Sequence, residues 1–246
     1  MKKILTALVA VFSMAVSAQD MYVAIHYVTV KSSDAQKLID LEKQYFSKLH
    51  KASIDAGHKL GWDMWQLENG SDAQHTTFVY AHLTPEVESL WAGDNSTALF
   101  SETELAMASE KWSQLVLKST FIMTDFKGGF VPAQGETPAN YATIHYMNVD
   151  PLQYYEYENQ ELNVWQPYHK QNKLIRGWGL HKILNPVEDG GANYITAQFY
   201  TSLGDIYKIS EATGKLSKQE KANYTSILKQ RKMSRIDILS LVLSER

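Results

Sequence analysis

The clearest pattern of apolar and polar positions in the chain is an extended stretch that occurs twice. Residues 22–30 (YVAIHYVTV) and 141–149 (YATIHYMNV) share this pattern, and their histidines, His26 and His145, are 119 residues apart (145 − 26). β-Branched and aromatic side chains occupy both alternating faces, which predicts strands that are covered on both sides. A pattern repeated at this distance in a chain of 246 residues indicates one domain-sized unit written twice.

The segments after each stretch predict the rest of a unit, in the order strand, helix, strand, strand, helix, strand. In the first unit we expect these elements at residues 22–30, 34–55, 60–67, 76–83, 101–117 and 121–126. In the second unit we expect them at 141–149, from 151, from 176, and at 194–200, 218–234 and 236–243. This order is the ferredoxin-like arrangement, in which two helices cover one face of a four-stranded antiparallel sheet.

Local signals mark where several of these elements begin and end. Two capping boxes are expected, Ser33 with Gln36 and Ser101 with Glu104. Asp150 can cap the first helix of the second unit, because Pro151 suits the first helical position. Pro167 is expected to kink or end that helix. Residues 69–72 are turn formers and predict a hairpin, and residues 85–92 predict a short helical piece.

The chain therefore divides into a signal peptide (1–18), a first ferredoxin-like repeat (19–127), a linker rich in glycine and proline (128–138) and a second repeat (139–246). The free face of each sheet would carry apolar residues such as Val28 and Met147. Because water would penalise such faces, we expect an α+β fold in which the two sheets pack on each other and close a barrel within one chain. The protein would then be a monomer with two pseudo-symmetric halves.

Residues 1–18 have the parts of a secretory signal peptide: Lys2 and Lys3, an apolar run, and small residues ending at Ala18. Cleavage before Gln19 would give a secreted or periplasmic protein. The apolar run is shorter than the ~20 residues that cross a bilayer, so we expect no membrane span.

Composition and charge exclude several classes of protein. The chain has no cysteine, which excludes disulfides and thiolate chemistry. Loss of the signal peptide lowers the basic residues from 24 to 22 against 27 acidic ones, so the net charge moves from −3 to −5 (22 − 27). With this acidic balance and no basic cluster, nucleic acid is not an expected partner.

Residues 25–30, the helix start at 33–35, and the Gly-Trp pairs at 61–62 and 177–178 resemble the dimeric α+β barrel superfamily. This superfamily includes stress-responsive barrel proteins, NIPSNAP-like proteins and antibiotic-biosynthesis-type monooxygenases. Its members usually pair two identical chains, so this sequence resembles a tandem version. The resemblance implies a ligand space between sheet and helices or between the sheets, with a polar residue of the first strand pointing into it.

His26 and His145 stand at that first-strand position. Each has an isoleucine and a tyrosine as neighbours, so burial would let it act as an acid, a base or a donor to a ligand. The alternative is a buried histidine satisfied by a nearby hydroxyl or carboxylate. Glu42 and Glu158, 116 residues apart (158 − 42), could reach these histidines and fix their tautomers, or could lie on solvated helix faces.

Aromatic residues could stack on a flat ligand or could simply fill the core. The candidates for ligand contact are Trp62, Trp178, Tyr146 and Trp165, together with His169. By sequence alignment His169 has no counterpart in the first unit, so a single active half would be the second.

Metal ligands are not expected, because no two histidines have the i, i+4 spacing of a helical metal site and no thiolate is present. We therefore expect no metal and no cofactor, although one axial histidine could still hold haem.

Three hypotheses remain open at this point. The first is a protein that binds a small, partly aromatic molecule in its interior. The second is a cofactor-free oxygenase or isomerase that uses a strand-one histidine as acid or base. The third is a structural duplication with a filled core and no ligand.

Overall fold

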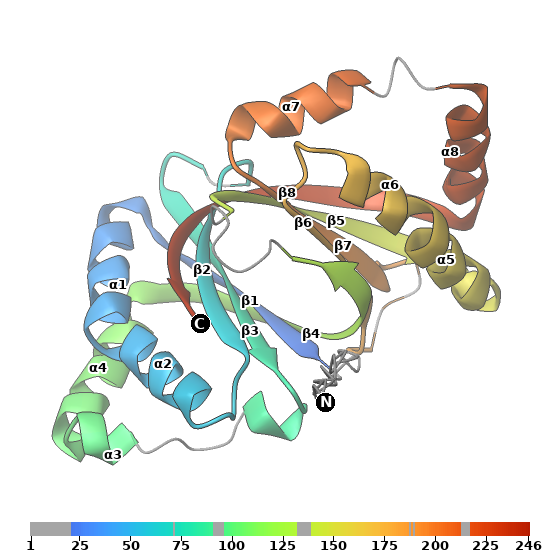
Figure 1. Cartoon of the computed structure of the whole chain (residues 1–246). Helices are drawn as coiled ribbons and strands as arrows, with labels where there is room; N and C mark the ends of the chain where they lie inside the picture. The colour runs from blue at the N-terminus through green and yellow to red at the C-terminus, as the bar shows by residue number, and fades with distance from the viewer. Residues whose placement is uncertain are drawn as a thin grey trace, which may run out of the picture.

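The strands of the protein form one closed antiparallel barrel, seen in the computed structural model (Figure 1). The structure describes residues 21–70, 72–90, 96–131, 139–186, 188, 190–212 and 217–246. Around the barrel the strands follow the order β1-β3-β2-β8-β5-β7-β6-β4. The fold is therefore α+β, and the barrel uses strands from both ends of the chain. The signal peptide expected at 1–18 lies outside the described residues.

Every strand expected from the sequence is present in the structure. The strands are β1 (Tyr22–Lys31), β2 (Gly61–Leu67), β3 (His75–Thr84), β4 (Val116–Phe130), β5 (Tyr141–Val149), β6 (Gly177–Ile183), β7 (Tyr194–Tyr200) and β8 (Arg231–Glu245). The last strand of each half is longer than expected, since β4 was predicted only at 121–126 and β8 only at 236–243. Residues 128–130 of the expected linker belong to β4, and residues 132–138 lie outside the described residues.

The extra length of β4 and β8 closes the barrel. β4 pairs with β1 of its own half and with β6 of the other half, while β8 pairs with β5 and with β2. The halves are thus joined edge to edge by backbone hydrogen bonds as well as face to face by side chains. This arrangement removes the unpaired strand edges that an open sheet would expose.

The first helical segment of each half contains an inserted π-helical turn. In the first half the segment runs through Ser32–Asp34, α1 (Ala35–Leu41), the π-helix Glu42–Phe46 and α2 (Ser47–Asp55). In the second half it runs through Pro151–Gln153, α5 (Tyr154–Gln160), the π-helix Glu161–Trp165 and α6 (Gln166–Gln171). The two π-helices begin 119 residues apart (161 − 42). Helical spacing in the sequence predicted the segments but not these turns.

The remaining helices lie between the third and fourth strands of each half. They are the short turn Glu88–Leu90, α3 (Ser96–Leu99), α4 (Glu102–Leu115), α7 (Leu203–Ala212) and α8 (Lys218–Gln230). The helices α3 and α7 were not predicted. No helix within the described ranges has the length and apolar character required to cross a bilayer.

The capping predictions had mixed outcomes. Ser101 accepts from the backbone of Glu104 in the expected capping box, and Asp150 accepts from the backbone N–H of Leu152 at 2.9 Å. The capping box at Ser33 is wrong, because the segment opens with a 3₁₀ turn and Gln36 instead donates to Asp40. Pro167 does not end its helix, which continues to Gln171. There the proline occupies one of the first positions after the π-helix.

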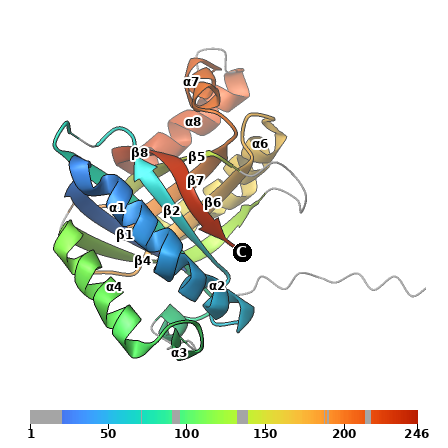
Figure 2. The same ribbon diagram turned by 90° about the vertical axis from the view of Figure 1, so that its left-hand side faces the viewer.

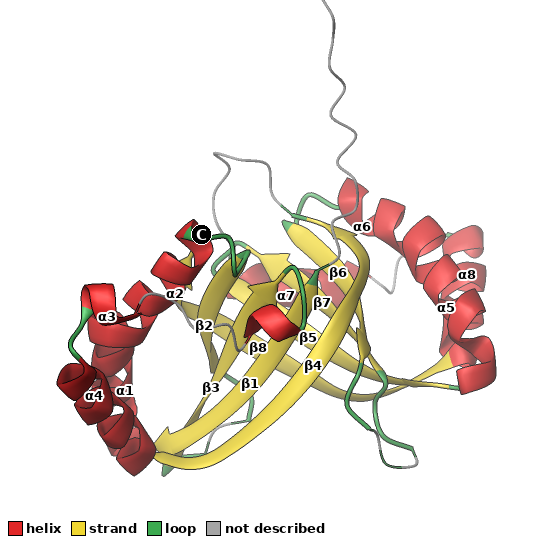
Figure 3. Ribbon diagram, turned by 90° about the horizontal axis from the view of Figure 1, so that it is seen from below, coloured by secondary structure: helices red, strands yellow, loops and turns green. Residues whose placement is uncertain are grey.

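Two helical layers flank the barrel on opposite sides, as Figures 2 and 3 show. Ile25 and Tyr146 belong to the core inside the barrel, which draws on both halves. Val28 lies under the first helical layer and Met147 under the second. The expectation that Val28 and Met147 face the opposing sheet was therefore wrong. Both faces of each first strand are apolar, so the sequence pattern did not decide which face turned inward.

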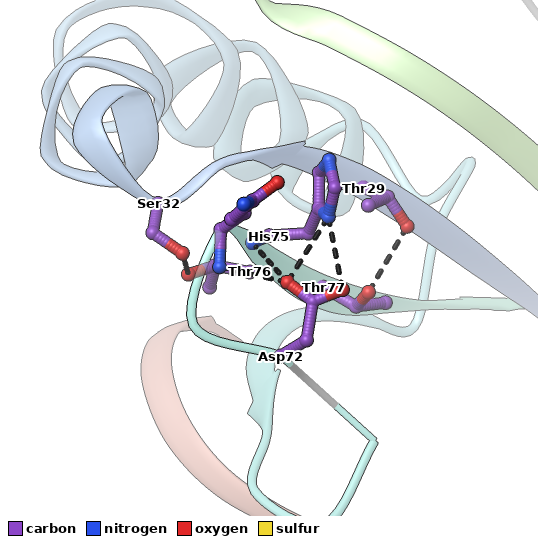
Figure 4. Close-up of polar contacts among 7 residues, drawn as sticks. Thr29, Ser32, Asp72, His75, Thr76 and Thr77 are labelled. Carbon is purple, nitrogen blue, oxygen red and sulfur yellow. Dashed lines mark hydrogen bonds and ion pairs between the residues drawn. The ribbon is translucent and has the colours of Figure 1, made fainter.

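The hairpin between β2 and β3 is fixed by Asp72, which belongs to the predicted turn (Figure 4). Its carboxylate accepts from the backbone N–H groups of Gln74 and His75, each at 2.7 Å, and contacts His75 Nδ1 at 3.0 Å. These bonds are typical of an Asx turn, in which the side chain replaces a backbone acceptor. This exposed histidine therefore has a structural role.

Candidate functional site

A pocket of about 240 Å³ lies between the sheet and the helices of the first half. Its walls come from β1, the π-helix, α2, β3 and α4. The lining residues are His26, Glu42, Phe46, His50, Tyr80, His82, Ser109, Trp112 and Ser113. His26 and Tyr80 are direct partners in the β1–β3 ladder, so strand alternation places both side chains on the helix-facing side. The structure thus brings the predicted residues His26 and Glu42 to one pocket.

Glu42 is the first residue of the π-helix and is 2% exposed. Its Oε1 accepts hydrogen bonds from Tyr80 Oη at 2.9 Å and from Trp112 Nε1 at 3.1 Å. Burial raises the pKa of this carboxyl to about 7, although both hydrogen bonds act in the opposite direction. The carboxyl can therefore take up or release a proton near neutral pH, as a general acid or base must. π-Helical turns occur frequently at functional sites.

The pocket histidines are held in the neutral form. Burial lowers the pKa of His26, and burial together with the charge of Lys59 lowers the pKa of His50 to about 2 and of His82 to about 3. His26 Nε2 lies 2.6 Å from Ser119 Oγ. Within the described part of the chain, the buried Nδ1 of His82 has no hydrogen-bond partner. A buried polar atom of this kind is costly unless something else satisfies it, which favours a ligand or water in the pocket.

The corresponding place in the second half is filled by protein. Glu161 begins the second π-helix, as Glu42 begins the first, and it forms a buried ion pair with Arg231. The sequence comparison had matched Glu158 to Glu42, but Glu158 accepts from Tyr194 Oη at 2.5 Å instead. The three-residue difference arises because strands two and three of the halves are 116 residues apart, whereas the first strand and its helix keep the spacing of 119.

His169 has a counterpart in the first half after all. His50 and His169 are 119 residues apart (169 − 50), and each stacks on the tryptophan of the following strand. The ring centroids are 4.8 Å apart for His50 and Trp62 and 5.6 Å apart for His169 and Trp178. Both tryptophans are fully buried, so each packs against other side chains of the protein. Alignment at 119 residues could have identified His50 from the sequence.

The other predicted residues do not line the pocket. His145 Nε2 lies 3.0 Å from Thr143 Oγ1, and burial lowers its pKa to about 4. Trp165 packs near His169, with ring centroids 6.1 Å apart. Tyr146 lies inside the barrel, where its hydroxyl bonds to that of Tyr27. Tyr80, His82 and Trp112 complete the pocket but were not among the predicted residues, because they come from β3 and α4 and carry no local motif.

Among the residues that the structure describes, no group of three or more histidine, aspartate or glutamate side chains is arranged to hold a metal ion. The three pocket histidines do not change this: the ring centroids of His26 and His82 are 6.5 Å apart. The chemistry visible in the pocket is that of hydrogen bonding and proton transfer.

The fold resembles solved structures that share little sequence with this chain. A proposed monooxygenase from Lactobacillus acidophilus NCFM superposes with a TM-score of 0.63 at 11% identity, covering 92% of this chain and 96% of the other. One from Fusobacterium nucleatum gives 0.64 at 10% identity, covering 93% and 95%. An anthrone oxidase-like protein gives 0.54 at 16% identity, covering 93% and 94%.

The chain shares the α+β barrel fold of these structures. At these identities the likeness concerns the fold alone. No family model matches the sequence, and no curated protein matches it.

Proposed function

We propose that this chain binds a small, partly aromatic molecule in the first-half pocket, between the sheet and the helices. The observation that carries this proposal is the pocket itself, with a buried carboxyl at Glu42 and an unsatisfied imidazole nitrogen at His82. Phe46, Tyr80 and Trp112 supply aromatic faces against which a flat molecule can stack. The pocket volume of about 240 Å³ suits a compact ligand.

A binding experiment with a matched pair of variants tests this proposal. Small planar aromatic compounds are screened by ligand-observed NMR against the wild type, Ser109→Trp and Glu110→Trp. Ser109 lines the pocket, whereas its exposed neighbour Glu110 does not, so both variants add the same bulk but only one blocks the pocket. We expect compounds that bind the wild type and Glu110→Trp to lose binding to Ser109→Trp. Binding that Ser109→Trp leaves unchanged, or no binding at all, would contradict the proposal.

The second candidate function is a cofactor-free oxygenase or isomerase. It is favoured by the presence in one pocket of His26 and Glu42, two groups that can exchange protons with an enolisable or phenolic substrate. The fold likeness to proteins described as monooxygenases and as anthrone oxidase-like agrees with it. With a pKa of about 7, Glu42 suits general acid–base work near neutral pH. Oxygen consumption or substrate proton exchange that is lost in Glu42→Gln would support it, and turnover by that variant would exclude this role of Glu42.

We also propose that the chain is exported and that it arose by tandem duplication. Export rests on the signal-peptide pattern, and duplication on the paired first strands and paired π-helices. Intact mass of the exported protein is expected to correspond to a chain that begins at Gln19, and retained Met1 would contradict this. Sedimentation of the mature protein is expected to give a single-chain species.

A further inference from the structure

Arg231 fills, in the second half, the space that corresponds to the open pocket of the first half. Its Nη1 bonds to Glu161 and lies 2.8 Å from Met147 Sδ. Its charge also contributes to lowering the pKa of His145 and His169, the counterparts of His26 and His50. The guanidinium therefore lies among the same types of side chain that line the first pocket.

The residue at the matching position of the first half is Val116. Strand pairing establishes the match, because Val116 opens β4 opposite Val30 and Arg231 opens β8 opposite Val149, and these partners are 119 residues apart (149 − 30). The helix ends agree, since the N–H of Val116 bonds back to Trp112 and that of Arg231 to Ile227. The first half thus keeps the buried glutamate without the arginine.

We propose that the first-half pocket takes a compact organic cation, with an amidinium, guanidinium or ammonium group that pairs with Glu42. This inference rests on the proposed binding function and names the ligand class for the same pocket. In the second half, Arg231 provides an internal example of the group that this arrangement of side chains accepts. An Arg231-like cation supplied by a ligand would leave its apolar part against the aromatic walls.

The other charged and titratable groups around the pocket are compatible with a cation beside Glu42. In the described part of the chain, the hydrogen-bond donors to the Glu42 carboxyl are Tyr80 and Trp112, both neutral. Burial keeps His26 and His82 neutral, so they add no repulsion. Lys59 is a nearby cation, and its Nζ contacts His50 Nδ1 at 2.9 Å. Its charge contributes to lowering the pKa of His50 and His82. It is not among the groups that shift the pKa of Glu42.

Cation pairing would also release a proton. Below about pH 7 much of Glu42 is protonated, and a bound cation favours the ionised carboxylate and so lowers this pKa. Binding measured calorimetrically at pH 6.5 in two buffers of different ionisation enthalpy is therefore expected to release a sizeable fraction of one proton. The release is expected to vanish in Glu42→Gln.

Three probes of nearly the same shape test the proposal: benzamidinium, benzamide and benzoate, which are cationic, neutral and anionic. We expect benzamidinium to bind the wild type at least about tenfold more tightly than the other two, a difference of roughly 1.4 kcal/mol. Glu42→Gln should lose this preference, while Glu158→Gln, which changes a carboxylate outside the pocket, should keep it. Val116→Arg should abolish benzamidinium binding, because it supplies the guanidinium from the protein.

The outcomes separate this inference from the binding proposal. Benzamide or benzoate binding that Ser109→Trp blocks, without any advantage for benzamidinium, would overturn the cation inference and leave pocket binding intact. Failure of benzamidinium to bind at millimolar concentration would overturn it as well. Binding of all three probes that Ser109→Trp does not affect would count against both proposals. Circular dichroism and thermal melts of each variant show whether a loss of binding reflects a loss of fold.

Discussion

Dividing the chain within residues 132–138 is expected to give two fragments, neither of which folds alone as a monomer. Fragment 21–131 would lose the pairing of β4 with β6 and of β2 with β8, and so would fragment 139–246. Each would also expose its share of the core inside the barrel, which Ile25 and Ile144 build from opposite halves. Exposing several hundred Å² of apolar surface costs on the order of 10 kcal/mol, comparable to the stability of a whole domain.

Sedimentation and circular dichroism of the separate and mixed fragments provide the measurement. Apart, the fragments are expected to aggregate or to form homodimers, and together they are expected to form a one-to-one complex. As a control, an intact chain cut in place at an inserted protease site should remain associated and folded. Two well-folded, independent monomers would show that the seams between the halves contribute little.

Replacing Arg231 with valine, the residue of the first half, is expected to destabilise the protein by about 3–5 kcal/mol. The cost arises because Glu161 is 2% exposed and would be left as a buried carboxyl without its cation. For a protein of this size the loss corresponds to a fall in Tm of roughly 10 °C. Burial raises the pKa of Glu161 and the charge of Arg231 lowers it, so this pKa should rise further in Arg231→Val. The variant should therefore be least stable at high pH, where the buried carboxyl must ionise without its cation.

A double variant separates loss of the ion pair from loss of packing. Arg231→Val with Glu161→Gln should be more stable than Arg231→Val alone, because it removes the uncompensated charge. Lys232→Val, an exposed change next along β8, is the matched control and should stay within about 0.5 kcal/mol of the wild type. Thermal and urea unfolding give these values. A single variant as stable as the wild type would mean that the ion pair does not hold the second half closed.

Local sequence was sufficient to predict the strands and most of the helical segments. Residues 141–149 and 194–200 were predicted as strands and are β5 and β7, because β-branched and aromatic runs between turn residues specify a strand over a few positions. The capping box at Ser101 follows from the same kind of local rule. The repeat of the first strand also indicated α+β architecture and a barrel contained in one chain, since each unit presents an apolar sheet face that requires a cover.

Contacts between distant segments decided the site. The sequence placed His26 on a strand and Glu42 on a helix, but the pocket also needs Tyr80 and Trp112, which arrive from β3 and α4. The sequence favoured the second half, through His169, whereas the pocket lies in the first half. The difference between the halves lies in Val116 and Arg231, which are far along the chain from the π-helices. Periodicity reports which residues share one face of one element. Which faces meet, and whether a buried glutamate finds an arginine there, depends on the pairing of strands that begin 70 and 66 residues after those helices (116 − 46 and 231 − 165). Only the tertiary structure determines this pairing.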